Sequence, residues 1–347
     1  ISSYITRKVA DRLNEIFKQE RADYENKWDS LKIFIEYGII TDEKFAEKAT
    51  DFVLLKNVDQ KYFTLSEYAT LVKEGQTDKN GNVIYLYTND PVSQNSFVGA
   101  ARDKGYDVLV MDGQLDTHFI GWFENKNQGT RFVRVDADVV DKLIEKENNL
   151  KMALSSAQQD LLRPVFEAQL PAEDKIRYTV SFEPMAENQM PVMITQNEFM
   201  RRMKDMAAMG GSGMQFYGQL PDNFNVVING NHPLVAEILG EVEASYGDKL
   251  KTTNKKLDAA IAEQRSFEEL VKDKKAEDFS QEEKDKQQEV DKKVEDLRRQ
   301  RTERLTEIGR ENKLVKQVVD LALLSNSMLK GENLTNFIRR SVELIGK

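Results

Sequence analysis

Residues 82–111 read NVIYLYTNDPVSQNSFVGAARDKGYDVLVM, and their pattern predicts the architecture of the middle of the chain. Its two ends, residues 82–87 and 106–111, are almost continuously apolar and β-prone, which is typical of strands covered on both faces. Residues 91–104 between them have a helical pattern that Gly105 ends. A strand, a helix and a strand within about 30 residues predict a βαβ unit with a right-handed parallel crossover.

Residues 132–135 provide a third strand, so residues 51–155 are expected to form a small unit of αβα layers. A βαβ unit can bind a nucleotide when a glycine-rich loop follows its first strand. Here that turn is Thr88-Asn89-Asp90-Pro91, which contains no glycine, so we expect no nucleotide in this unit. Asp138 can cap a long helix that continues through Leu154.

Residues 1–50 form a helical segment in this interpretation. Apolar residues from Ile5 to Ile35 recur at spacings of three and four. Gly38 suits the end of a helix, and Thr41-Asp42-Glu43-Lys44 suits the start of the next one.

Residues 156–246 are expected to form a second layered unit of α+β type. Pro164 should interrupt or restart the preceding helix. Strands are expected at residues 177–182, where side chains alternate, and at 225–229. Pro233 suits the first position of the following helix.

Residues 247–312 differ sharply in composition. Of residues 247–311, 18 are acidic and 17 are basic, and only a narrow apolar stripe remains. Ser280-Gln281-Glu282-Glu283 is a capping-box pattern, which predicts a helix start and therefore a turn before it. We interpret the segment as an antiparallel helical hairpin, with one long helix or partial disorder as alternatives.

Residues 313–347 are expected to form two C-terminal helices. Residues 314–324 are apolar nearly all round, and the second helix carries a narrower apolar seam. An isologous dimer interface, with two helices from each protomer, would bury them as a four-helix bundle. The candidate interface residues are Leu321, Leu324, Leu334, Phe337, Ile338 and Ile345. The whole chain is thus predicted to be a multidomain protein of mixed α+β and α/β class.

A methionine-rich stretch lies between Met185 and Met214, which contains eight of the eleven methionines. Its centre, residues 197–206, predicts one amphipathic helix with an apolar stripe about 60° wide. The glycine-rich residues 210–213 should end that helix and form a flexible loop. Such a stripe either faces a core or forms an adaptable binding surface, since methionine is unbranched and polarizable. The candidate contact residues are Phe199, Met200, Met203 and Met206.

Composition excludes several function classes. A net charge of −9 argues against a nucleic-acid-binding protein, and no apolar run approaches the roughly 18 residues that span a membrane. There is no cysteine, and the two histidines, His118 and His232, lack ligand spacing, so no metal site is expected. We identify no catalytic residue. The chain begins without methionine inside a helical pattern, so we expect a fragment of a longer protein.

Several stretches in sequence order resemble the ninety-kilodalton heat-shock chaperone family in its bacterial form. They are residues 1–13, residues 31–40, residues 82–115 with Lys104-Gly105-Tyr106-Asp107-Val108-Leu109, Phe199-x-x-x-Met203-Lys204, Asn229-x-x-His232-Pro233-Leu234, and Asn333-Leu334-x-x-Phe337-x-x-Arg340. The resemblance implies the later part of the family's middle domain followed by its C-terminal dimerisation domain. It also implies an ATP-dependent parent chaperone whose ATP and magnesium site lies in an N-terminal domain before this chain. No cofactor and no ATPase activity are therefore expected here.

The resemblance further implies a cytoplasmic homodimer that binds unfolded or partly folded client proteins. It places the helix at residues 197–206 at the inner face of the dimer, which favours client contact over core packing. It also places Phe119 and Trp122 near a second client-contact patch, with ordinary core packing as the alternative. The charged hairpin departs from the bacterial family pattern, and a structural coiled-coil adaptor is the competing function.

Overall fold

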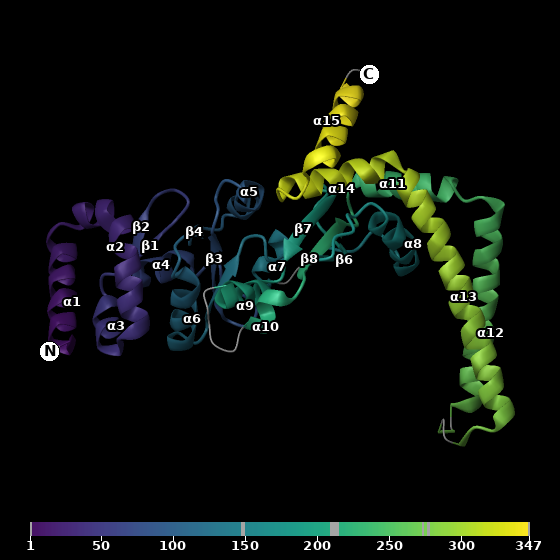
Figure 1. The fold of residues 1–347 in the computed structure, drawn as a ribbon, viewed down its shortest axis with the longest axis horizontal. Coiled ribbons are helices and arrows are strands. Elements are labelled where there is room, and N and C mark those ends of the chain that lie inside the picture. Colours follow the sequence, from purple (N-terminus) through teal and green to yellow (C-terminus); the bar gives the residue numbers. More distant parts are fainter. Residues whose placement is uncertain (1, 147–149, 209–214, 273, 276–277, 346–347) are drawn as a thin grey trace.

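The computed structural model describes residues 2–146, 150–208, 215–272, 274–275 and 278–345. The molecule is elongated, with a helical segment at its N-terminal end, two units of strands and helices, and a helical hairpin at the far end (Figure 1). This mixture of helices and strands agrees with the predicted α+β class. Among the helices in the described part of the chain, none combines the length and apolar character needed to cross a membrane.

Three helices form the N-terminal segment: α1 Ser2–Gln19, α2 Arg21–Thr41 and α3 Glu43–Ala49. The Asp42 carboxylate accepts the backbone N–H groups of Lys44 and Phe45 at 3.0 and 3.1 Å, which confirms the predicted start of α3. The predicted helix end at Gly38 is wrong, because α2 continues to Thr41. Gly38 instead permits close packing, since a Cβ atom there would lie 2.7 Å from the Phe45 ring.

The first αβ unit contains one two-stranded and one three-stranded sheet. Its elements are β1 Leu54–Lys56, β2 Tyr62–Thr64, α4 Leu65–Val72, β3 Val83–Thr88, α5 Asn95–Asp103, β4 Val108–Val110, α6 Asp116–Lys126, β5 Thr130–Arg134 and α7 Val140–Leu143. The larger sheet has the order β4-β3-β5, and both neighbours of β3 are parallel to it, which confirms the predicted parallel strands. Strands β1 and β2 pair antiparallel and were not predicted.

Strand β3 is buried on both faces, which explains its continuous apolar sequence. Tyr85 and Tyr87 belong to an aromatic core that includes the buried residues of α2 and α6. Ile84 and Leu86 face the opposite core, which α5 covers. Gly105, at φ of 78°, follows α5 as predicted.

The long helix predicted after Asp138 is wrong. Helix α7 ends at Leu143, and Ile144 already has an extended backbone with φ of −120° and ψ of 106°. A new helix, α8 Ser156–Glu167, starts at a capping box between Ser155 and Gln158. Pro164 lies inside α8 and does not interrupt it.

The second αβ unit contains a mixed sheet of order β6-β8-β7, in which β6 is parallel and β7 antiparallel to β8. Its elements besides α8 are β6 Ile176–Glu183, β7 Val192–Gln196, α9 Glu198–Ala208, α10 Gln215–Gln219, β8 Asp222–Asn229, α11 Pro233–Ala244, α14 Lys313–Ser325 and α15 Gly331–Ile345. One face of the sheet packs in a large core against α8, α11 and α14. On the other face, Met193 and Val227 meet Val139 of the first unit.

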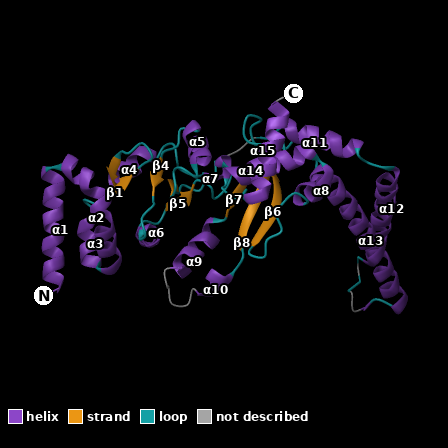
Figure 2. Cartoon of the chain, turned by 45° about the horizontal axis from the view of Figure 1, so that its top comes forward, coloured by secondary structure: helices purple, strands orange, loops and turns teal. Residues whose placement is uncertain are grey.

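The charged segment forms the predicted hairpin of two helices, α12 Asp248–Val271 and α13 Gln281–Glu311 (Figures 1 and 2). The predicted capping box at Ser280 and Glu283 is present, which rules out one uninterrupted helix. Leu257, Ala260 and Val294 form a narrow seam between the helices. At the base of the hairpin, Leu305 and Ile308 of α13 join the core of the second unit, so the hairpin is rooted in that core.

Candidate functional site

Helix α9, predicted as the methionine helix, is oriented with its polar side inward. Its one buried residue is Arg201, which is 7% exposed. The apolar side chains are more accessible, with Phe199 59% exposed and Met200, Met203 and Met206 half-buried. The usual arrangement of an amphipathic helix is the reverse, with the apolar stripe facing the core.

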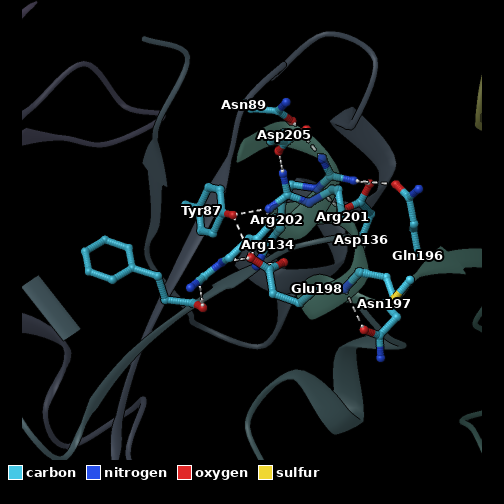
Figure 3. A network of polar contacts seen from close by, with 12 residues as sticks. Tyr87, Asn89, Arg134, Asp136, Gln196, Asn197, Glu198, Arg201, Arg202 and Asp205 are labelled. Atoms are coloured by element: carbon cyan, nitrogen blue, oxygen red, sulfur yellow. Dashed lines mark hydrogen bonds and ion pairs between the residues drawn. The ribbon is translucent and has the colours of Figure 1, made fainter. Parts of the chain in front are cut away.

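The polar side of α9 is built around Glu198, whose side chain lies against β3 and β5 of the first unit (Figure 3). Its Oε1 accepts hydrogen bonds from the Tyr87 hydroxyl at 2.7 Å, from Arg202 Nε at 2.6 Å and from Arg201 Nη2 at 2.9 Å. The backbone N–H of Arg134 donates to the other oxygen, Oε2, at 3.2 Å. One carboxylate therefore connects the first turn of α9 to two strands of the neighbouring unit.

The two arginines extend these contacts. Arg202 donates to the Glu124 carboxylate of α6 at 2.8 Å and to the Phe132 carbonyl oxygen of β5 at 2.6 Å. Arg201 donates to the Tyr87 hydroxyl, and its guanidinium carbon lies 5.9 Å from the centroid of that ring. We call the side chains that make these contacts the α9 anchor: Tyr87, Glu124, Glu198, Arg201 and Arg202.

The anchor is charged at neutral pH. Burial raises the pKa of Glu198, but the positive charges of Arg201 and Arg202 and the hydrogen bond from Tyr87 outweigh it and lower the pKa below the ordinary value. Burial, assisted by the Glu198 charge, raises the pKa of the Tyr87 hydroxyl, which therefore stays protonated and can donate. Buried ion pairs add little net stability, but breaking one is costly because it leaves a buried charge without a partner. The ion pairs of the anchor therefore favour this one orientation of α9.

A second group of polar contacts joins the two units beside the anchor. Arg134 donates to Asp136 at 2.8 Å and to Gln196, the last residue of β7, at 3.4 Å. Gln94 also donates to Asp136 at 3.0 Å. The strand that leads into α9 is therefore held against the first unit before the helix begins.

The opposite side of α9 forms what we call the methionine surface: Phe199, Met200, Met203 and Met206. Within the described residues, none of the four belongs to a hydrophobic core cluster. Helix α10 lies beside α9 and adds Phe216, which is 66% exposed (Figures 1 and 2). The core-facing interpretation of this stripe does not fit the structure.

The other methionines of the stretch have different surroundings. Met185 is buried and Met193 half-buried, and both pack in a small cluster with Val139 and Val227. Met190 is 37% exposed. Met209, Met214 and the predicted loop at 210–213 lie outside the described residues.

The two aromatic candidates on α6 differ from each other. Phe119 is 1% exposed and belongs to the aromatic core, so the core-packing alternative accounts for it, and the client-contact prediction for Phe119 is not supported. Trp122 is half-buried and stacks on Phe119 with ring centroids 5.8 Å apart. Only Trp122 of this pair can reach a partner at the surface.

The candidate dimer residues divide into an inner and an outer group. Leu321 and Leu334 are partly buried and Phe337 is 9% exposed, and all three pack in the core of their own chain. Helix α14 is thus largely buried by the second unit itself, although the sequence predicted that a dimer interface would bury it. Leu324 and Ile338 are 38% and 53% exposed. The side chain of Ile345, at the end of α15, lies outside the described residues.

Two features of α15 were missed in the sequence. Val342 is 62% exposed, lies one helical turn after Ile338 and extends the apolar strip. Asp320 of α14 is fully buried and pairs with Arg340 of α15 and, at 2.8 Å, with Lys316. This carboxylate fixes the direction in which α15 leaves the body of the molecule (Figure 1).

Within the described ranges, no group of three or more histidine, aspartate or glutamate side chains is arranged to hold a metal ion. His232 Nδ1 accepts the backbone N–H of Leu234 at 3.0 Å and so caps α11. Its role is structural.

Comparison with known proteins identifies the family. A family model described as Hsp90 protein matches residues 1–260. The chain belongs to the Hsp90 family. It is 46% identical over 345 residues to the chaperone protein HtpG of Bacteroides thetaiotaomicron, which covers 99% of this chain and 50% of that protein. It is 44% identical over 345 residues to HtpG of Porphyromonas gingivalis, with the same coverage.

A more distant Hsp90 relative, HtpG of Bdellovibrio bacteriovorus, is 25% identical over 248 residues, or 69% of this chain and 38% of that protein. The chain spans about half the length of the curated relatives it matches. The resemblance inferred from the motifs is confirmed. The Bacteroides and Porphyromonas matches cover 99% of the chain and therefore include the charged hairpin.

Proposed function

We propose that this chain provides the client-contact surface and the dimer interface of an ATP-dependent molecular chaperone of the Hsp90 family. The observation that carries the proposal is the orientation of α9, in which Arg201 is buried while Phe199 is 59% exposed and the three methionines Met200, Met203 and Met206 are half-buried. Its relatives are named as chaperones, which is consistent with a surface for unfolded chains.

The chemistry of the methionine surface suits many partners. Flexible, polarizable thioethers adapt to differently shaped apolar side chains, so a shallow methionine surface favours breadth over affinity. Phe216 of α10 and Trp122 of α6 supply aromatic side chains that are at least partly accessible. The substrate class is therefore an unfolded or partly folded polypeptide with exposed apolar segments.

The proposed dimer uses an outer strip of exposed residues, Leu324, Ile338 and Val342. The inner residues Leu334 and Phe337 pack in the core of their own chain. Packed against the same strip of a second copy, these side chains would leave water in an isologous four-helix arrangement. ATP binding and hydrolysis are assigned by family resemblance to a domain before this chain. We therefore expect this chain to hydrolyse no ATP.

The test is binding of a reduced, carboxymethylated protein, which cannot refold, to the purified chain by fluorescence anisotropy. Changing Phe199, Met203 and Met206 together to serine should weaken binding about tenfold or more. This corresponds to a loss of about 1.4 kcal/mol or more in the free energy of binding. The matched control is Phe34→Ser on the distant α2, where the ring is 74% exposed. Unchanged binding in the triple variant would refute the proposal, and a large loss of thermal stability would show that the stripe is core.

A shortened hairpin separates this function from the adaptor alternative. The deletion must spare Leu250, Leu305 and Ile308, because these residues belong to the core of the second unit. Replacing residues 255–299 by a short glycine linker meets that condition. Retention of unfolded-protein binding would exclude the adaptor function, and its loss in this variant would favour the hairpin as the binding element.

A further inference from the structure

Helix α9 belongs to the second unit by sequence, but its buried polar contacts are mostly with the first unit. It follows β7 along the chain, yet the anchor pairs it with β3, β5 and α6 of the first unit. Toward the second unit, Lys204 makes one ion pair, at 2.7 Å, with Asp222 at the start of β8. The balance of buried polar contacts therefore holds α9 to the first unit.

The edge of strand β5 explains why these contacts are specific. Strand β5 pairs with β3 on one side, and among the described residues no strand pairs with the N–H and C=O groups on its other side. Side chains satisfy them instead: Phe132 N–H donates to Glu124 at 2.7 Å, and the Phe132 carbonyl accepts from Arg202. Arg134 N–H donates to Glu198. Detaching α9 would leave the edge groups that Arg202 and Glu198 satisfy without a protein partner, which is unfavourable.

Glu198 has more hydrogen-bond partners than any other member of the anchor. Its carboxylate accepts from both arginines, from Tyr87 and from the β5 backbone. It is also adjacent in sequence to Phe199, the most exposed residue of the methionine surface. Moving the Glu198 side chain from the β5 edge would therefore move the methionine surface with it.

We propose that α9 moves as one body with the first αβ unit, and that Glu198 is the positioning residue that sets the orientation of the methionine surface relative to the second unit. Any rotation between the two units then redirects the surface toward or away from the C-terminal helices. The role assigned to this orientation in client binding depends on the proposed function, whereas the attachment of α9 to β5 does not.

The direct test measures hydrogen exchange of the Arg134 amide in the full chain, with residue resolution, for Glu198→Gln. Loss of the carboxylate acceptor should speed exchange at Arg134 and along α9 by about tenfold or more, because a local opening is made easier. The matched control is Asp205→Asn, which removes a carboxylate that also pairs with Arg201, at 2.6 Å, on the same helix. The control should change exchange at Arg134 by less than about twofold. Equal exchange in the wild-type chain and Glu198→Gln would overturn the proposal.

The second readout is binding of the reduced, carboxymethylated protein. Glu198→Gln should weaken it several-fold although no residue of the methionine surface is altered. Faster exchange at Arg134 with unchanged binding would show that Glu198 anchors α9 but does not position the surface, which overturns that part. If the triple serine variant binds the unfolded protein as well as the wild-type chain does, the proposed function is rejected. The exchange result would still show whether Glu198 attaches α9 to β5. Tyr87→Phe, which keeps the ring and removes only the hydroxyl, replaces Glu198→Gln if that variant does not fold.

Discussion

Gly309, where α13 crosses α8, offers a test of how rigidly the charged hairpin is attached. A Cβ atom added there would lie 2.4 Å from the Val165 carbonyl oxygen and 2.7 Å from the Val165 Cα. Both are backbone atoms, so α8 and α13 must separate to admit even a methyl group. The Gln169 amide donates to the carbonyl oxygens of Gly309 and Arg310 at 2.6 and 3.1 Å, and separation would disturb these bonds as well.

The expected magnitude for Gly309→Ala follows from two opposing effects. Alanine is favoured over glycine inside a helix by about 1 kcal/mol. Forcing an extra carbon into a packed contact costs typically about 1–3 kcal/mol, and the core at this contact contains the fully buried Val165. We therefore expect a net loss of up to about 2 kcal/mol in the free energy of unfolding of the second unit.

The assay uses two signals during urea unfolding. Both tryptophans, Trp28 and Trp122, lie outside the second unit, so their fluorescence follows the N-terminal part, whereas far-ultraviolet circular dichroism follows the whole chain. Gly309→Ala should shift part of the dichroism transition to lower urea and leave the fluorescence transition in place. The matched control is Gly240→Ala in α11, where an added Cβ atom would meet no neighbouring atom within 4 Å outside the helix's own backbone. A stabilisation of up to about 1 kcal/mol is expected there. Equal stability of the two variants would show that the contact between α8 and α13 can admit a methyl group without loss.

Three further predictions concern the dimer and the helical segment. Ile338→Ser with Val342→Ser should convert a dimer into a monomer in light scattering without lowering the melting temperature, because both side chains are more than half exposed in one chain. Asp320→Asn should also weaken the dimer, since α15 loses its buried ionic partner, whereas the control Lys316→Gln should not. Burial, with a neighbouring carboxylate, raises the pKa of Glu36 to about 9, so the folded state loses stability as pH rises from about 4.5 toward 9. Glu36→Gln should therefore stabilise the fluorescence-detected transition by about 1–3 kcal/mol at pH 8 and leave it unchanged at pH 4.

The elements that the sequence predicted correctly are those with a strong local pattern. Strand β3 was recognisable because burial on both faces requires a continuous apolar run. The capping box at Ser280 and the Asp42 cap marked helix starts for a similarly local reason, since the side chain bonds to a backbone group within three residues. The hairpin was predictable because its narrow stripe and its cap both lie within one segment.

The errors occurred where a distant contact overrides a local signal. Gly38 has the residue type of a helix end, but its close neighbour is Phe45 in the next helix. Strands β1 and β2 have three residues each, too few to show a period. Helix α14 looked too apolar for a small domain, yet the sheet and α8 of the same chain bury it.

For α9, periodicity alone identified a helix with one apolar and one polar side. It could not say which side faces inward, because that depends on what neighbouring elements offer. The first unit offers a strand edge with unpaired backbone groups, a tyrosine hydroxyl and the Glu124 carboxylate, from residues 64 to 114 positions away in the chain. Placing Glu198, Arg201 and Arg202 there satisfies these groups, and Phe199 and the half-buried methionines lie on the more accessible side of the helix. The sequence thus supplied the amphipathic helix, and long-range pairing of polar groups turned it outward.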